Sequence, residues 1–224
     1  MKREQEVMAL VEAIQGADDS ERSKAVIALG QSGDQRAVEP LIALLKHENP
    51  RVRWGAIQAL WRLKNLRSLA PLCSALKDED DYVRRAASYA LGQLGDRQAI
   101  EPLLIALQDE NAGVRIAASL AFGQIGAAAV KPLLAFLVKT DYSNEVEHAL
   151  RAMNDPGVAD ILINSLKRED SRVRVYAAKL LMHFYSEEVI THLKQALTDP
   201  DSDVRHYAQV SLDVLSAKDE VEPE

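Results

Sequence analysis

The chain has 224 residues, 47% of them hydrophobic, which is enough apolar material for a substantial core. The formal net charge of −7 gives no excess of positive charge for a phosphate backbone, and this argues against a nucleic-acid partner. A single cysteine, Cys73, excludes an internal disulfide, and the lack of a long apolar run or signal-like segment predicts a cytoplasmic protein with no membrane partner.

Three sequence markers recur with a stride of 31 residues. Val-Arg stands at 52–53, 83–84 and 114–115, and returns at 173–174 and 204–205. A proline and an Ala-Leu-Gly motif keep the same period, which predicts a repeat array. The predicted repeats lie near 1–33, 34–65, 66–96, 97–126, 127–154, 155–185 and 186–216, within one domain, 1–216. Residues 217–224 are expected to form an acidic, disordered tail.

Residues 36–65 illustrate the predicted unit. The segment 37–45 has apolar residues at helical spacing, with Pro40 near its start. A polar turn follows, and Asn49 and Pro50 are typical of a new helix start. The second helix is expected to run from Val52 to about Leu63. Each unit is therefore a helix, a tight turn and a second helix.

An arginine and a short polar residue recur in each second helix. The polar residue lies four positions before the arginine, where it can cap the free N–H groups of the helix start. The caps are Asp18, Asn49, Asp80, Asn111, Asp170 and Asp201, and the arginines are Arg22, Arg53, Arg84, Arg115, Arg174 and Arg205. We expect each arginine to bond a carboxylate or carbonyl of its own or the neighbouring turn, as a structural ladder.

Residues 83–96, Val-Arg-Arg-Ala-Ala-Ser-Tyr-Ala-Leu-Gly-Gln-Leu-Gly-Asp, closely resemble the short HEAT repeat of phycobilisome-lyase-like proteins. The resemblance covers about residues 20–216. It implies an all-α, right-handed α-solenoid of the HEAT-like or armadillo type, with about seven helix-turn-helix repeats. Members of this class include bilin lyases, phycobilisome-degradation factors, deoxyhypusine hydroxylase and proteins that only bind other proteins.

Positions two, three, six and ten after each repeated valine should face outward and line the concave surface of the solenoid. Trp, Tyr and Arg are frequent anchors of protein interfaces, and several fall on or beside this surface. The predicted binding residues are Trp54, Gln58, Trp61, Arg62, Arg85, Tyr89, Gln93, Leu120, Gln124, Tyr176, Lys179, His183, His206 and Tyr207. For Trp54 and Trp61 a second interpretation stays open, in which they cover the seam between repeats.

Repeat five departs from the pattern. Glu147 stands where the ladder arginine is expected, and the turn before it is irregular. One hypothesis is a hinge near 140–157 that separates two binding halves. The alternative is simple drift of one repeat.

The functional expectation is a non-catalytic scaffold or adaptor that holds a protein partner and needs no cofactor. One alternative is a bilin lyase or phycobilisome-associated protein. Aromatic and cationic residues of the concave face offer stacking surface and cations to a tetrapyrrole: Trp54, Trp61, Arg62, Arg85 and Tyr89. A metal-dependent oxidoreductase like deoxyhypusine hydroxylase is less favoured. That enzyme class carries repeated His-Glu pairs, whereas here only His47-Glu48 occurs, so neither a metal site nor a catalytic group is predicted.

Overall fold

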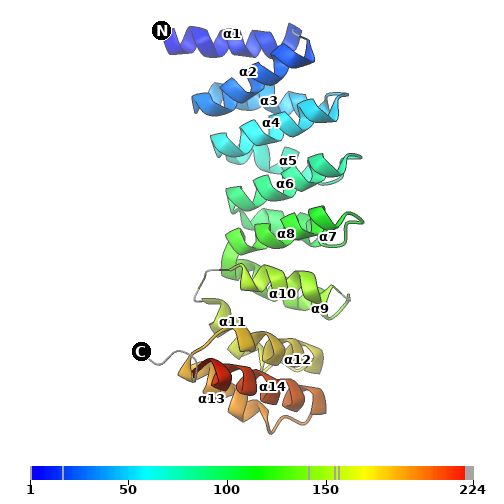
Figure 1. Cartoon of the computed structure of the whole chain (residues 1–224), viewed down its shortest axis with the longest axis vertical. Coiled ribbons are helices and arrows are strands. Elements are labelled where there is room, and N and C mark those ends of the chain that lie inside the picture. Colours follow the sequence, from blue (N-terminus) through cyan, green and yellow to red (C-terminus); the bar gives the residue numbers. More distant parts are fainter. Residues whose placement is uncertain (1, 17, 141, 154, 156, 220–224) are drawn as a thin grey trace. The chain divides into compact units, whose positions relative to one another are not determined.

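The structure is a computed structural model that describes residues 2–16, 18–140, 142–153, 155 and 157–219. These residues form helices and turns, with no strand among them. The chain divides into two compact units, residues 1–124 and 125–224. Within each unit, short hairpins of two helices follow one another (Figure 1), which confirms the predicted α-solenoid fold class. The single domain 1–216 and the handedness of the superhelix stay predictions.

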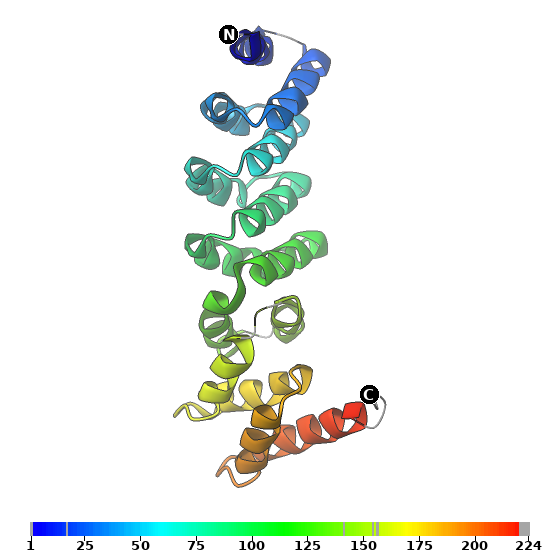
Figure 2. The same cartoon turned by 90° about the vertical axis from the view of Figure 1, so that its left-hand side faces the viewer.

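Unit 1 contains four second helices of the predicted hairpins. These longer helices are α2 (Asp19–Ser32), α4 (Pro50–Leu63), α6 (Asp81–Leu94) and α8 (Ala112–Ile125). The preceding elements are α1 (Lys2–Gly16), η1 (Gln35–Ala37), α3 (Val38–Ala43), η2 (Leu44–Lys46), η3 (Leu66–Ser68), α5 (Leu69–Ala75), η4 (Arg97–Ala99) and α7 (Ile100–Ala106). In Figure 2 the cyan and green helices form two layers, one of first helices and one of second helices.

Unit 2 has shorter and less regular hairpins. Its elements are η5 (Gly126–Ala129), α9 (Val130–Leu137), α10 (Ser143–Arg151), α11 (Gly157–Ser165), α12 (Ser171–Leu180), η6 (Leu181–His183), α13 (Glu187–Ala196) and α14 (Ser202–Asp219). The last helix continues through residues 217–219, which the sequence analysis assigned to the tail. The rest of that predicted tail, 220–224, lies outside the described residues.

Each predicted cap bonds the start of its helix. Asn49 Oδ1 accepts from Arg51 N at 2.9 Å, and Asp80 Oδ1 accepts from Val83 N at 3.1 Å. Asp18, Asn111, Asp170 and Asp201 accept equivalent backbone bonds. Because these bonds satisfy N–H groups that have no partner within the helix, they fix where each second helix begins. The cap prediction is confirmed.

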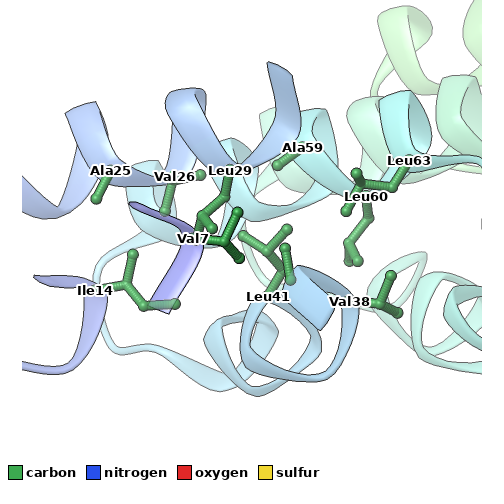
Figure 3. Packing of buried hydrophobic residues seen from close by; sticks show 11 residues of the cluster. Val7, Ile14, Ala25, Val26, Leu29, Val38, Leu41, Ala59, Leu60 and Leu63 are labelled. Carbon is green, nitrogen blue, oxygen red and sulfur yellow. The ribbon is translucent and has the colours of Figure 1, made fainter. Parts of the chain in front are cut away.

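The core lies between the two helix layers and continues from one hairpin to the next. Figure 3 shows Val7 of α1, Leu29 of α2 and Leu41 of α3 pointing toward one another, and each is at most 1% exposed. An alanine recurs at one position of the second helices and is buried at each of them: Ala25, Ala56, Ala87, Ala118, Ala177 and Ala208. Alanine at this position lets neighbouring helices approach closely while keeping high helix propensity.

Glycine brings two of the seams in unit 1 even closer. A Cβ added to Gly92 of α6 would lie 2.6 Å from Cα of Ala121 on α8. The same addition to Gly30 of α2 would lie 2.8 Å from Cα of Ala59 on α4. Real Cβ atoms do not approach this closely, so these seams require glycine. The equivalent residue of α4 is Trp61, and the seam between α4 and α6 must therefore be wider at this point.

Residues 112–137 are long and apolar enough to cross a membrane by length and composition, with a mean hydropathy of 1.6. Half of its most apolar stretch of 18 residues is buried inside the protein. A left-handed residue, Gly126 with φ 76°, breaks the segment into α8 and α9. The apolar residues of the segment therefore supply core packing in both helices.

Candidate functional site

Two ladder arginines of unit 1, Arg53 and Arg84, join their own hairpin to the next. Arg53 donates from Nε and Nη2 to both carboxylate oxygens of Asp78, at 2.8 and 2.7 Å. Arg84 holds Asp109 in the same way, at 2.7 and 3.0 Å. Nη1 of each arginine donates to two carbonyls of its own turn. These charge-assisted bonds raise the pKa of both guanidinium groups, and they confirm the predicted structural role.

The other ladder arginines make parts of the same pattern. Arg174 of unit 2 holds Asp199 with two bonds of 2.9 Å. Arg115 and Arg205 donate Nη1 to carbonyls of their own turns, and Arg22 donates Nε to the Ile14 carbonyl at 2.9 Å. Each of the six therefore bonds a carbonyl or carboxylate in a turn or adjoining helix end.

Glu147 replaces the ladder arginine in α10 and has acquired other partners. Its carboxylate lies 3.1 Å from His183 Nε2 and 3.6 Å from Lys179 Nζ. Two predicted binding residues, Lys179 and His183, are thus brought together by an acid that the sequence suggested as part of a hinge or as drift of one repeat. All three side chains are partly buried.

The loop after α10 is tied to η5 within unit 2. Asp155 accepts from Ala127 N at 2.8 Å and from Gly157 N at 2.9 Å, and these bonds hold the pKa of the Asp155 carboxyl below its usual range. Residues 141, 154 and 156 of the predicted hinge lie outside the described part of the chain. The hinge stays a prediction, which amide exchange across 140–157 would test.

The second helices of unit 1 present a common outer face, here called the second-helix face. Its exposed large apolar side chains come from all four helices: Ile27, Trp54, Tyr82, Tyr89, Ile116 and Leu120. Their exposed fractions run from 43% for Tyr89 to 58% for Tyr82. Two positions expected to face outward do not: Ala86 and Ala117 are 5% and 8% exposed, because they lie in the seams.

Four aromatic residues line the seam between α4 and α6, which we call the aromatic groove: Trp54, Trp61, Tyr82 and Tyr89. Trp61 meets Tyr89 edge to face with ring centroids 5.7 Å apart, and its indole N–H donates to Gln58 Oε1 at 3.1 Å. At the other end, Trp54 and Tyr82 border a pocket of about 440 Å³ that Pro50, Arg51 and Asp80 also line. Trp61 thus covers the seam and also contributes to the outer face.

Three exposed arginines flank the aromatic groove and take no part in the ladder. The Arg85 guanidinium carbon lies 4.9 Å from the centre of the Tyr82 ring, and that of Arg62 lies 5.4 Å from the Trp61 ring. Arg51 lines the pocket. Cation–π contacts of this kind hold a side chain in place but leave its N–H donors available.

A model of the protein family described as HEAT repeats matches residues 7–89, 69–154 and 147–213. The chain belongs to the HEAT-repeat family. The match spans nearly the whole chain, so it includes the irregular hairpin of Glu147 as well as the regular hairpins of unit 1.

Solved structures similar to this HEAT-repeat protein cover almost all of it. A chain of the complex of CpcE and CpcF of phycocyanin lyase from Nostoc sp. PCC7120 is 25% identical, with a TM-score of 0.55, over 93% of this chain and 94% of that one. Human deoxyhypusine hydroxylase is 20% identical with a TM-score of 0.41, over 97% and 98%. A designed armadillo-repeat protein in complex with the peptide (KR)4 is 18% identical with a TM-score of 0.45, over 92% and 98%. No curated protein matches.

The predicted binding residues fall in both units of the HEAT-repeat protein. In unit 1, Trp54, Arg62, Arg85, Tyr89, Leu120 and Gln124 are exposed, and Gln58, Trp61 and Gln93 are partly buried. In unit 2, His206 is exposed, and Tyr176, Lys179, His183 and Tyr207 are partly buried. His206 and Tyr207 meet with ring centroids 5.2 Å apart. A concave wall shared by both sets stays a prediction.

Sequence reasoning missed Tyr82 and Arg51. Tyr82 precedes the repeated valine of its helix by one residue, and Arg51 has the same place in α4, so the 31-residue period contained the signal. Ile27 was also missed, although it shares its repeat position with Tyr89 and Leu120.

The described residues contain no group of three or more His, Cys, Asp or Glu side chains placed to hold a metal. Cys73 is partly buried at a pocket of about 390 Å³ between α5 and α7, and burial raises the pKa of its thiol. A raised pKa lowers the thiolate fraction, which makes this cysteine a weak nucleophile.

Proposed function

We propose that this HEAT-repeat protein is a non-catalytic scaffold that holds a protein partner on the second-helix face of unit 1. The observation that carries the proposal is the set of six exposed, large apolar side chains on four successive helices. Single exposed apolar residues are common, whereas a contiguous series is typical of an interaction surface. The resemblance to a chain of the CpcE and CpcF complex also supports a role in assembly with another protein.

The scaffold would bind through pre-organisation. Ladder bonds and glycine seams hold the α-helices of unit 1 in place, so the face loses little conformational freedom when a partner binds. Trp54 and Tyr89 supply the aromatic anchors on which interface energy usually concentrates.

The test compares two pairs of alanine substitutions in the full chain. Trp54→Ala with Tyr89→Ala removes anchors from the second-helix face. Leu66→Ala with Ile105→Ala removes side chains that are 60% and 62% exposed but lie on the first-helix side. Affinity purification with quantitative mass spectrometry should recover the same partner with wild type and the control pair, and lose it with the first pair. Equal recovery of the partner by the wild type and both variant pairs, at unchanged helix content, would falsify the second-helix face as the binding surface.

A second candidate function is the handling of a bilin chromophore. It is favoured by the 25% identity and TM-score of 0.55 to the phycocyanin-lyase chain. A tetrapyrrole is flat and apolar and carries carboxylates, so aromatic rings beside Arg62 and Arg85 suit it. Bilin mixed with the protein should then show a red-shifted absorbance and an induced circular dichroism that Trp54→Ala with Tyr89→Ala removes. If neither the absorbance shift nor the circular dichroism appears, bilin handling is excluded and the scaffold function remains.

A further inference from the structure

The arginines around the aromatic groove indicate which partner the face accepts. The side chains of Arg53 and Arg84 bond the ladder acids and carbonyls, whereas Arg51, Arg62 and Arg85 have no carboxylate partner among the described residues. All three are exposed and lie on the same face as the anchors. The face therefore carries three cations that make no ion pair with a described residue of the protein.

The acids of the neighbouring turn bond groups other than these arginines, although Asp80 also lines the pocket beside Arg51. Asp80 caps α6 through Val83 N at 3.1 Å. Asp81 accepts a hydrogen bond from the Asn111 side chain. Asp78 and Asp109 hold the ladder arginines. A carboxylate that accepts hydrogen bonds from any of these three arginines would therefore belong to a binding partner.

We propose that the aromatic groove recognises an acidic polypeptide segment whose apolar side chains pack among the four rings. This inference rests on the proposed scaffold function and specifies the chemistry of its partner. Carboxylates of the segment accept N–H bonds from Arg51 and Arg85 at one end of the groove and from Arg62 at the other. Its apolar side chains enter the pocket between Trp54 and Tyr82.

The helix geometry sets the spacing of those carboxylates. Arg51 and Arg62 are eleven residues apart on α4, which is about 16 Å along the helix at about 1.5 Å per residue. An extended segment advances about 3.3 Å per residue. A segment lying along the groove would therefore place two acidic residues about five positions apart, with apolar residues between them.

The test is a selection of random displayed peptides on the full-length protein at low salt. Selected peptides should be enriched about twofold in Asp and Glu over the starting library, and added salt should weaken their binding to the protein. Arg51→Gln, Arg62→Gln and Arg85→Gln combined should return the acid content to that of the library. Arg85→Gln alone should reduce the enrichment. Arg97→Gln, an exposed arginine of η4, is the matched control and should change nothing.

Two results separate this inference from the function on which it rests. If neutral or basic peptides are enriched and their binding still requires Trp54 and Tyr89, the inference of an acidic partner is wrong, whereas the second-helix face remains the binding surface. No enrichment, or enrichment insensitive to Trp54→Ala with Tyr89→Ala, would overturn both.

Discussion

The seam between α6 and α8 and the seam between α4 and α6 differ at one repeat position. Gly92 lets α6 approach Ala121 of α8 so closely that no Cβ would fit. Trp61 at the same position keeps α4 and α6 apart and meets the ring of Tyr89. Both seams keep the same arginine bond to the following turn. The residue at this one repeat position thus decides whether the seam is a close helix contact, as with glycine, or part of an aromatic groove, as with tryptophan, while the arginine–aspartate bond is kept.

The largest effect on stability is expected from removing the arginine–aspartate bond that both seams contain. Arg84→Ala would leave Asp109, whose side chain is 11% exposed, without its cation. An uncompensated carboxylate in such a place should lower the free energy of unfolding by about 3 kcal/mol. Urea denaturation measures the loss. The control, Arg205→Ala, removes an exposed arginine that bonds only carbonyls and should cost less than about 1 kcal/mol. Equal losses would show that the carboxylate bond adds no stability.

The second prediction concerns the closed seam alone. Gly92→Ala forces a methyl group to within 2.6 Å of Ala121 Cα, so the helices must separate. We expect a loss of about 2 kcal/mol, despite the better helix propensity of alanine. Gly16→Ala, where nothing lies within 4 Å of the new methyl, is the matched control and should be neutral or stabilising. A stable Gly92→Ala protein would contradict the close approach.

The third prediction concerns the wider seam. Trp61 is partly buried, so Trp61→Ala should cost about 1.5 kcal/mol, less than a fully buried tryptophan would. Trp54→Ala should cost under about 0.5 kcal/mol, because Trp54 is 44% exposed. Thermal unfolding compares the two. The reverse order would mean that Trp54 covers the seam and Trp61 does not.

The smallest effect is expected from pH. Partial burial raises the pKa of Asp109, but bonds from Arg84 and from the Asn111 N–H outweigh it, and the pKa stays below its usual range. This contribution to stability is therefore complete above the unfolded pKa, near 3.9, and is lost as pH falls through the lower folded value. Between pH 7 and pH 2.5, Asp109→Asn should lose about 1 kcal/mol less stability than wild type. Glu101→Gln, an exposed acid on α7, should follow wild type. Parallel curves of stability against pH for the wild type and both variants would show that Asp109 makes no pH-dependent contribution to stability.

The repeat period made most of the fold predictable. It located the second helices, because a cap such as Asn49 and a valine such as Val52 recur in phase. It also predicted that the arginines would bond turns. It did not identify the particular acceptors, Asp78 and Asp109, because a bond across 25 residues depends on how neighbouring hairpins stack.

The candidate site was less predictable than the fold. The outward positions assume one ideal helix, and they misplace Ala86, which is only 5% exposed. Tyr82 was missed because it precedes the repeated valine, although it lies opposite Trp54 across the seam. The partners of Glu147 come from a later hairpin, so nothing near this residue in the sequence indicated them.

Arg53, Arg84 and Arg174 each bond an acid 25 residues later, and this fixed spacing has a consequence for evolution by gain or loss of whole repeats. Excising residues 66–96 would place Arg53 opposite Asp109, at the same separation that now joins it to Asp78. A gene that lost this segment would still encode a matched arginine and aspartate, and the shortened protein would lack one hairpin, with Tyr82 and Tyr89 of the aromatic groove. The number of repeats and the character of the binding surface can therefore change independently in descendants of this chain.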